Sequence, residues 1–487
     1  MSGTPRVLHV AAECHPLVKT GGLADVVGAL PPALAAAGVD VRVLLPGYAE
    51  VLTTLAASDP PTPVGAPFGA LFGAARVRLL RTVVPGTQVP LYLLDAPWLF
   101  GRAGNPYLAP DGAGWRDNHL RFALLGYVAA QFGAGALDPD WQPDIVHAHD
   151  WHAALAPVYL RQHPANDVRT VFTIHNLAFQ GRFPLGVADA LGIPPSELTP
   201  SALEFHGDLS FMKGALLRAD AITTVSPSYA REILGVAGGE GLDGVLRDRR
   251  ARLHGILNGV DVVSWDPARD AALAKTYTAR NATAAKRANR RALRAEFGLP
   301  DDGRPLFALV GRLTWQKGID LLLDAARDPA LADLQLLVLG TGEPAFEAAL
   351  RALAETAPDR IATRIAFDET LAHRVFGGAD AVLVPSRFEP CGLTQLYGLR
   401  YGALPIVRRV GGLADTVVDE RAGETGTGFV FEAADAADLR DTLLRASALY
   451  RDAPRRWQAL MARGMATDVS WAAPARAYVD LYEGLSA

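Results

Sequence analysis

Residues 306–326 read LFALVGRLTWQKGIDLLLDAA, which is an apolar run, a loop bounded by glycines, and a second apolar run. The first run has the length and composition of a buried strand, and the second places Ile, Leu and Ala at helical spacing. A strand that passes through a short glycine loop into a helix is the first half of a β-α-β unit. This stretch therefore predicts a parallel sheet covered by helices.

The same alternation runs along the chain in two series. The first predicts strands at residues 6–10, 39–45, 145–148, 168–174 and 221–225, with helices at 23–36, 119–132 and 153–162. The second predicts strands at 306–310, 334–339, 361–366, 381–384 and 404–407, with helices at 319–326, 343–355, 371–376 and 393–402. Alternating strands and helices predict the α/β class, with two doubly wound, Rossmann-like domains facing across a cleft.

Two segments outside this alternation bear on the domain organisation. The series breaks near residue 255, which predicts a first domain at 1–255 and a second at 256–470. Residues 271–296 are polar and rich in Ala and Arg, which favours an exposed helical segment. The last stretch, 471–487, has a helical pattern with aromatic residues.

Composition and charge exclude several classes of protein. Half of the 487 residues are hydrophobic and 20% are charged, which supports more than one buried core. The net charge of −5 makes nucleic acid an unexpected partner. With two cysteines, Cys14 and Cys391, there is no disulfide framework, which favours a cytoplasmic location. No signal-peptide pattern and no apolar run of membrane-spanning length occurs, so a membrane is not expected either.

The loop at residues 13–25, ECHPLVKTGGLAD, has the composition of an anion-binding loop. Gly21 and Gly22 allow the backbone to approach a ligand, and the N–H groups at the start of the next helix favour a negative charge. Lys19 adds a cation, so a diphosphate site is one interpretation and a solvated loop is the other. The pentapeptide GGLAD recurs at 411–415, which predicts a second glycine loop before a helix.

Two loops of the second series carry charged residues after a predicted strand. Arg312 and Lys317 lie on one strand-to-helix loop, which favours contact with phosphate oxygens over two unrelated surface cations. Glu389 lies in PSRFEPCGLT, residues 385–394, before the next helix. A carboxylate there can bind sugar hydroxyls, or it can serve only as a helix cap.

Histidines cluster in HAHDWH, residues 147–152, and His175 follows a later strand. The alternating spacing places His147 and His149 on the same face of a strand. A metal site needs further ligands, and none is evident in the sequence. The cluster therefore favours hydrogen bonding to a polyhydroxylated ligand.

Taken together, these motifs resemble the bacterial and plant glycogen/starch synthase family, whose members are retaining glycosyltransferases with two Rossmann-like domains, the GT-B architecture. The matching stretches are KTGGL at 19–23, HAHDWH at 147–152, HNLAFQG at 175–181, LNGVD at 257–261, GRLTWQKG at 311–318 and EPCGLTQLY at 389–397. They span nearly the whole chain in the family's order.

The resemblance implies transfer of glucose from ADP-glucose to the non-reducing end of an α-1,4-glucan such as glycogen, with retention of configuration. It implies that the first domain is the acceptor side, that the second binds the nucleotide sugar, and that the helix at 471–487 crosses back to the first. The implied catalytic residues are Lys19, His175, Arg312, Lys317 and Glu389. The implied substrate-binding residues are Lys19, Gly21, Gly22, Asp25, Asp150, His175, Asn258, Arg312, Lys317, Phe367, Glu389, Cys391, Gly392, Leu393 and Thr394.

Neither a metal ion nor a cofactor is implied, because fixed cations can stabilise the departing ADP. We expect a same-face displacement in which the departing phosphate helps to deprotonate the acceptor. A homo-oligomer is compatible with the sequence.

One departure from the family is Phe367, where a tyrosine is expected near the adenine; a phenyl ring can stack but cannot donate a hydrogen bond. The alternative is thus a related retaining glucosyltransferase that uses UDP-glucose or a different acceptor. The aromatic residues of the loop at 92–118, Trp98, Phe100, Tyr107 and Trp115, either stack on glucan rings or fill the domain. A glucan phosphorylase and a non-catalytic glucan-binding protein are more distant alternatives. The first needs a lysine that carries pyridoxal phosphate, and the second is expected to lose the phosphate-binding cations.

Overall fold

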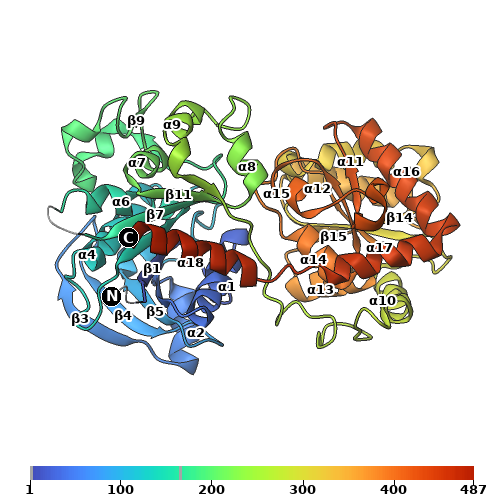
Figure 1. Ribbon diagram of the computed structural model, residues 1–487, viewed down its shortest axis with the longest axis horizontal. Coiled ribbons are helices and arrows are strands. Elements are labelled where there is room, and N and C mark those ends of the chain that lie inside the picture. Colours follow the sequence, from blue (N-terminus) through green and yellow to red (C-terminus); the bar gives the residue numbers. More distant parts are fainter. Residues whose placement is uncertain (1–3, 164–166, 487) are drawn as a thin grey trace. The chain divides into compact units, whose positions relative to one another are not determined.

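The computed structural model describes residues 4–163 and 167–486, and it divides the chain into two compact units (Figure 1). The first unit comprises Met1–Gly259 together with Trp471–Ala487, and the second comprises Val260–Ser470. The division thus falls after residue 259 rather than 255, and the C-terminal segment belongs to the first unit. Within the described residues, no helix has the length and apolar character needed to cross a membrane.

A nine-stranded sheet forms the centre of the first unit. In spatial order it contains β12 (Leu253–Gly255), β11 (Ala221–Thr224), β7 (Arg169–Ile174), β6 (Ile145–His149), β1 (Arg6–Val10), β2 (Asp40–Pro46), β5 (Pro90–Asp95), β4 (Val77–Val83) and β3 (Thr62–Phe68). The strands from β12 to β5 are parallel, and β4 and β3 extend the edge as antiparallel strands. A small antiparallel sheet lies apart from it, with β8 (Arg182–Pro184), β10 (Asp208–Ser210) and β9 (Glu204–Phe205).

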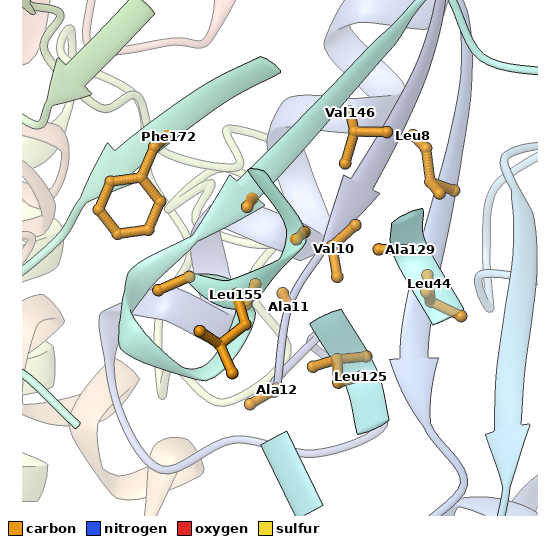
Figure 2. Close-up of a cluster of buried hydrophobic side chains, with 14 of the residues drawn as sticks. Leu8, Val10, Ala11, Ala12, Leu44, Leu125, Ala129, Val146, Leu155 and Phe172 are labelled. Carbon is orange, nitrogen blue, oxygen red and sulfur yellow. The ribbon is translucent and has the colours of Figure 1, made fainter. Parts of the chain in front are cut away.

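The helices of the first unit cover this sheet. They are α1 (Gly22–Ala36), α2 (Ala49–Ser58), α3 (Pro97–Phe100), α4 (Asn118–Gly133), α5 (Asp150–Ala153), α6 (Leu155–Leu160), α7 (Phe211–Arg218), α8 (Pro227–Glu232), α9 (Asp243–Asp248) and α18 (Ala472–Ser486). Apolar side chains of β1, β2, β6 and β7 pack against α4 and α6, as Figure 2 shows for Val10, Val146, Leu125 and Leu155. The C-terminal helix α18 packs against α1 (Figure 1).

The second unit contains a six-stranded parallel sheet. Its spatial order is β15 (Ile361–Ile365), β14 (Gln335–Gly340), β13 (Leu306–Val310), β16 (Ala381–Val384), β17 (Leu404–Arg408) and β18 (Phe429–Phe431). Its helices are α10 (Ala282–Phe297), α11 (Ile319–Ala326), α12 (Pro344–Thr356), α13 (Glu369–Gly378), α14 (Thr394–Tyr401), α15 (Gly411–Thr416), α16 (Ala436–Asp452) and α17 (Pro454–Ala466). Numbered along the sheet, the strand order is 3-2-1-4-5-6, that of a Rossmann fold. The doubly wound α/β prediction is confirmed.

Each sheet has a point where the strand order reverses, and ligands of open α/β sheets bind beyond the carboxyl ends of the strands at that point. In the first unit the reversal lies between β1 and β6, and in the second between β13 and β16. The loops after these four strands are the ones that the sequence marked as functional. Each unit therefore presents its charged loops where its topology favours a ligand.

The structure corrects two helix predictions. The helix expected at 153–162 is two short helices, α5 and α6, which break at Ala154. Pro157 lacks the N–H that would bond to the carbonyl of Ala153, so a continuous helix cannot form there. Within the polar stretch at 271–296, only the part from Ala282 onward is helical.

Candidate functional site

In the first unit, the loop after β1 is organised by the buried carboxylate of Glu13. Its oxygens accept hydrogen bonds from Thr20 N at 2.5 Å, Thr20 Oγ1 at 2.6 Å and Gly21 N at 3.1 Å. The hydroxyl of Tyr107 also donates to this carboxylate. Four donors on one carboxylate hold the loop that carries Lys19 and the glycines in a single conformation.

Lys19 lies at the start of α1, where Gly22 is the first helical residue. Its Nζ donates to Oδ1 of Asp25 at 2.7 Å, and both side chains are partly exposed. The ion pair fixes Lys19 beside the helix N-terminus, so its charge adds to that of the free N–H groups. The loop thus places a lysine, paired with a carboxylate, next to a helix N-terminus.

Asp150 follows β6 in a conformation that few residues adopt. Its φ is +55°, in the left-handed region, although it is not a glycine. Its Oδ1 accepts hydrogen bonds from the backbone N–H groups of His175 at 2.8 Å and Asn176 at 3.4 Å. Burial raises the pKa of Asp150 to about 7. A strained, buried carboxylate that joins the loops after β6 and β7 indicates a functional position.

The histidines around His175 form a buried hydrogen-bonded group rather than isolated side chains. Nε2 of His175 lies 2.9 Å from Nδ1 of His149, and Nε2 of His149 lies 2.9 Å from Nδ1 of His9. The rings of His147 and His149 are stacked with centroids 4.3 Å apart, which confirms that they share a face. Within residues 4–163 and 167–486, His9, His147 and His149 also meet the spacing of a metal site. Their nitrogens are nevertheless used in hydrogen bonds, which favours the interpretation as a hydrogen-bonded network.

In the second unit, the loop after β13 brings Arg312 and Lys317 together with the loop after β16. A Cβ on Gly318 would lie 2.1 Å from the carbonyl oxygen of Pro385, and Gly318 has a φ of +68°, so only glycine fits this approach. Arg312 is exposed, and its guanidinium makes no hydrogen bond or ion pair within the described part of the chain. It is therefore a cation available to a ligand.

Glu389 and Lys317 form an ion pair across these two loops. Nζ of Lys317 lies 2.5 Å from Oε2 of Glu389, and the hydroxyl of Ser386 donates to the same oxygen at 2.8 Å. The Glu389 side chain is 7% exposed, so the carboxylate is nearly desolvated and its two donors hold it in place. Glu389 is thus not a simple helix cap.

The repeated Gly-Gly pairs serve different purposes in the two units. A Cβ on Gly411 would lie 2.0 Å from the carbonyl oxygen of Glu389, and one on Gly412 would lie 2.2 Å from that of Cys391. A Cβ on Gly21, by contrast, would meet no atom within 4 Å. The second pair therefore lets α15 pack against the backbone of the Glu389 loop, whereas Gly21 of the first borders open space.

The remaining predicted residues have distinct surroundings. Cys391, Gly392, Leu393 and Thr394 form the turn into α14, with Gly392 at a φ of +71°. Asn258 is buried, and its Oδ1 has no hydrogen-bond partner among the described residues, which suits a ligand contact. Phe367 is 71% exposed in the loop before α13. A phenyl ring in this position is available for stacking.

Two residues that support the site, Glu13 and Ser386, had no role predicted from the sequence. His9 was expected to be structural, and Tyr107 was left undecided between sugar stacking and packing. The structure shows Tyr107 bonded to Glu13, Phe100 buried and Trp98 73% exposed. The one available signal was Glu13 itself, an acidic residue at the end of an apolar strand.

Two family models and many known proteins match this chain. Residues 6–248 match the starch synthase catalytic domain family, and residues 289–459 match the glycosyl transferases group 1 family. The chain is 49% identical over 487 residues to a glycogen synthase of Thioalkalivibrio sulfidiphilus, covering 99% of both chains. It is 50% identical over 482 residues to glycogen synthase 1 of Methylococcus capsulatus, covering 98% of this chain and 96% of that one.

Two solved structures extend the comparison to the fold. The catalytic domain of starch synthase IV from Arabidopsis thaliana, bound to ADP and acarbose, is 29% identical with a TM-score of 0.87 and full coverage of both chains. A sucrose-phosphate synthase from Thermosynechococcus elongatus, 21% identical with a TM-score of 0.61 and 99% coverage of both, shares the fold. The protein is a glycosyltransferase with the two-domain GT-B fold. Its extensive identity to bacterial relatives shows further that the chain belongs to the glycogen/starch synthase family.

Proposed function

We propose that this protein is a glycogen synthase that transfers glucose from ADP-glucose to the non-reducing end of an α-1,4-glucan, with retention of anomeric configuration. The observation that carries this proposal is the set of charged groups at the switch point of the second unit. Arg312 has no ion-pair partner among residues 4–163 and 167–486, and Lys317 is held against the buried carboxylate of Glu389. Cations suit a diphosphate leaving group, and a desolvated carboxylate suits sugar hydroxyls.

The proposed roles follow from the surroundings of each group. Arg312 and Lys317 bind the diphosphate and stabilise the charge that develops as ADP departs, while Glu389 binds hydroxyls of the transferred glucose. The turn from Cys391 to Thr394 offers backbone N–H groups at the start of α14 to the same sugar and phosphate. In the first unit, Lys19, held by Asp25 at the Gly21–Gly22 turn, and His175, beside Asp150, bind the donor as well.

We also propose that the reaction needs no metal ion and no resident cofactor. Two guanidinium or ammonium groups can neutralise a diphosphate that Mg²⁺ would otherwise neutralise. Activity that persists after dialysis against EDTA would support this, whereas activity that returns only with added Mg²⁺ or Mn²⁺ would contradict it.

The choice of ADP-glucose over UDP-glucose rests on the relatives, and the ring of Phe367 is the feature that leaves UDP-glucose as the alternative. The starch synthase IV structure is described as bound to ADP and acarbose, a pair that matches a nucleotide donor and a glucan-like acceptor. Phe367 can stack on an adenine but cannot donate a hydrogen bond to it. The cytoplasmic location, the glucan partner and a homo-oligomeric state are parts of the same proposal.

The test is incorporation of labelled glucose into glycogen from ADP-glucose and from UDP-glucose, measured side by side. Lys19→Ala tests the loop of the first unit, and Lys275→Ala, which removes an exposed lysine elsewhere, is the matched control. We expect transfer from ADP-glucose that is lost in Lys19→Ala and kept in the control. Transfer from UDP-glucose alone would change the donor assignment, and transfer from neither would contradict the proposed function.

A further inference from the structure

A continuous chain of buried polar side chains connects His175 to the C-terminal helix. From His175 it passes through His149 and His9 by contacts of 2.9 Å each, and it reaches the hydroxyl of Tyr482 on α18, 3.4 Å from Nε2 of His9. The same hydroxyl lies 2.7 Å from Nδ1 of His147. The chain therefore branches at Tyr482.

The strand register explains why these side chains meet. His9 on β1 is paired with His147 on β6, and His149 is paired with Thr173 on β7. Paired residues of parallel strands point to the same face, so the side chains form one row across three neighbouring strands. α18 supplies Tyr482 on that face, and the ring of Tyr482 lies 5.9 Å from that of His147.

All four imidazoles are neutral in this setting. Burial lowers the pKa of His9 and His175 to about 3, and burial together with neighbouring histidines lowers the pKa of His147 and His149 well below 6.5. Burial also raises the pKa of the Tyr482 phenol well above 10. A neutral imidazole has one N–H donor and one acceptor nitrogen. Along a row of neutral imidazoles, each ring therefore donates to its neighbour on one side and accepts from its neighbour on the other. The group at one end of the row determines which side is which, and thus the direction in which the hydrogen bonds run.

The single proton of the Tyr482 hydroxyl sets that direction. An O–H donor makes shorter hydrogen bonds than an N–H donor, so the phenol proton is assigned to the 2.7 Å contact with Nδ1 of His147 and not to the 3.4 Å contact with His9. With Nδ1 of His147 as acceptor, its Nε2 carries the hydrogen and donates to Oγ1 of Thr173 at 2.6 Å. Nε2 of His9 must then carry a hydrogen and donate toward the phenol oxygen. In turn, Nδ1 of His9 accepts from Nε2–H of His149.

The alternation of donor and acceptor nitrogens continues along the chain to His175. Nδ1 of His149 accepts from Nε2–H of His175, so Nδ1 of His175 keeps a lone pair. No described residue bonds to that nitrogen. The opposite proton arrangement, with Tyr482 donating to His9, would make Nδ1 of His175 a donor instead.

We propose that Tyr482 is a positioning residue that sets the direction of this chain, so that Nδ1 of His175 accepts a hydrogen bond from a hydroxyl group of the donor sugar. The inference rests on the proposed function for the identity of the ligand. It assigns to the C-terminal helix a role in substrate recognition through two intervening histidines. Tyr482 itself does not touch the substrate.

The test uses the full-length Tyr482→Phe variant, which removes the hydroxyl and keeps the ring. Without it, both directions of the chain become accessible, and we expect kcat/KM for ADP-glucose to fall about three- to tenfold, as for the loss of one neutral hydrogen bond. The matched control is Tyr159→Phe, which also removes a buried hydroxyl with a 2.7 Å hydrogen bond, to the carbonyl of Leu191. We expect the control to retain kcat/KM within about twofold.

A second readout reports the tautomer directly. In protein labelled with ¹⁵N-histidine, the ¹⁵N shifts distinguish protonated from unprotonated ring nitrogens, and His175→Asn assigns the signal. We expect His175 to be protonated at Nε2 in the unaltered protein and to show a changed tautomer distribution in Tyr482→Phe.

The two readouts together decide the proposal. Protonation of His175 at Nδ1 in the unaltered protein would overturn it, and so would a fall in activity without a change of tautomer, or a change of tautomer without a fall in activity. The tautomer is read without turnover. An unaltered protein that transfers no glucose would therefore contradict the proposed function while the spectra still test the direction of the chain.

Discussion

Nζ of Lys317 lies 2.5 Å from Oε2 of Glu389, and this contact joins the loops after the two strands that flank the switch point of the second unit. The pair places a cation and a carboxylate side by side at the position where we propose that the diphosphate and the sugar of the donor bind. Because Glu389 is nearly buried, water compensates little of its negative charge, and Lys317 supplies that compensation before substrate binds.

The ion pair predicts that Lys317→Ala impairs both activity and stability. Within the part of the chain that the structure describes, the variant leaves Ser386 as the one side-chain donor to Glu389, and it removes a cation from the proposed leaving-group site. We expect kcat/KM for ADP-glucose to fall by about a hundredfold or more, and the free energy of unfolding to fall by about 1–3 kcal/mol. Initial rates and urea titrations measure the two effects. Lys275→Ala is the control, and a Lys317→Ala protein with full activity would contradict the assigned role.

For Arg312 we expect a large effect on activity and almost none on stability. Its guanidinium has no partner in the described part of the chain, so Arg312→Ala should change the free energy of unfolding by less than about 0.5 kcal/mol. Loss of a cation from the diphosphate should still lower kcat/KM about a hundredfold, with partial recovery in Arg312→Lys. Arg327→Ala, which removes an exposed arginine paired with Asp324, serves as control. Equal activity of the Arg312→Ala and Arg327→Ala proteins would refute the prediction.

Replacing Glu13 should lower activity indirectly, by loosening the loop at Thr20 and Gly21 and not by removing a contact with the substrate. Gln in its place presents an N–H₂ group where the carboxylate accepts from Thr20, Gly21 and Tyr107. We expect Glu13→Gln to lower kcat/KM about tenfold and to lower the free energy of unfolding by about 1–3 kcal/mol. The exposed Glu50→Gln on α2 is the matched control. Unchanged rates and an unchanged urea midpoint in Glu13→Gln would show that the carboxylate does not organise the loop.

The raised pKa of Asp150 should make the free energy of unfolding of the protein depend on pH. Burial raises the pKa of Asp150 from 3.8 to about 7 in the folded protein. Between about pH 4 and pH 7, therefore, the carboxyl group is protonated in the folded state and ionised in the unfolded state. The stability contributed by this group is therefore full below about pH 4 and is lost as the pH rises through 7. Asp150→Asn keeps an acceptor oxygen for the N–H groups of His175 and Asn176 but has no such proton.

The unaltered protein loses this stability as the pH rises, whereas Asp150→Asn does not. We therefore expect the difference in free energy of unfolding, variant minus unaltered protein, to become more positive by about 2–3 kcal/mol between pH 5 and pH 8. Urea titrations at both pH values measure it, with the exposed Asp140→Asn as control. A difference that is independent of pH would show that Asp150 is ionised at both values.

The elements that the sequence predicted well are those with a local signal. The strands Arg6–Val10, Leu306–Val310 and Ala381–Val384, and the helix Ile319–Ala326, have the predicted bounds because each is a continuous apolar or periodic run between turn residues. The antiparallel strands β3 and β4 were not predicted. β3 is largely exposed and contains Pro and Gly, so its pairing with β4 depends on a neighbour and not on its own pattern.

The charged loops could be read from the sequence because strand, loop and helix are consecutive, so Lys19, Arg312 and Glu389 follow their strands in any doubly wound fold. Their partners could not be read in this way. Lys317 and Glu389 are 72 residues apart, Glu13 and Tyr107 are 94 apart, and His147 and Tyr482 are 335 apart. Contacts at such separations depend on strand order, register and helix packing, which no local pattern encodes. The residue types at the site were thus written in the sequence, whereas the ion pair, the strained Asp150 and the histidine chain arise from the way the folded sheets bring distant segments together.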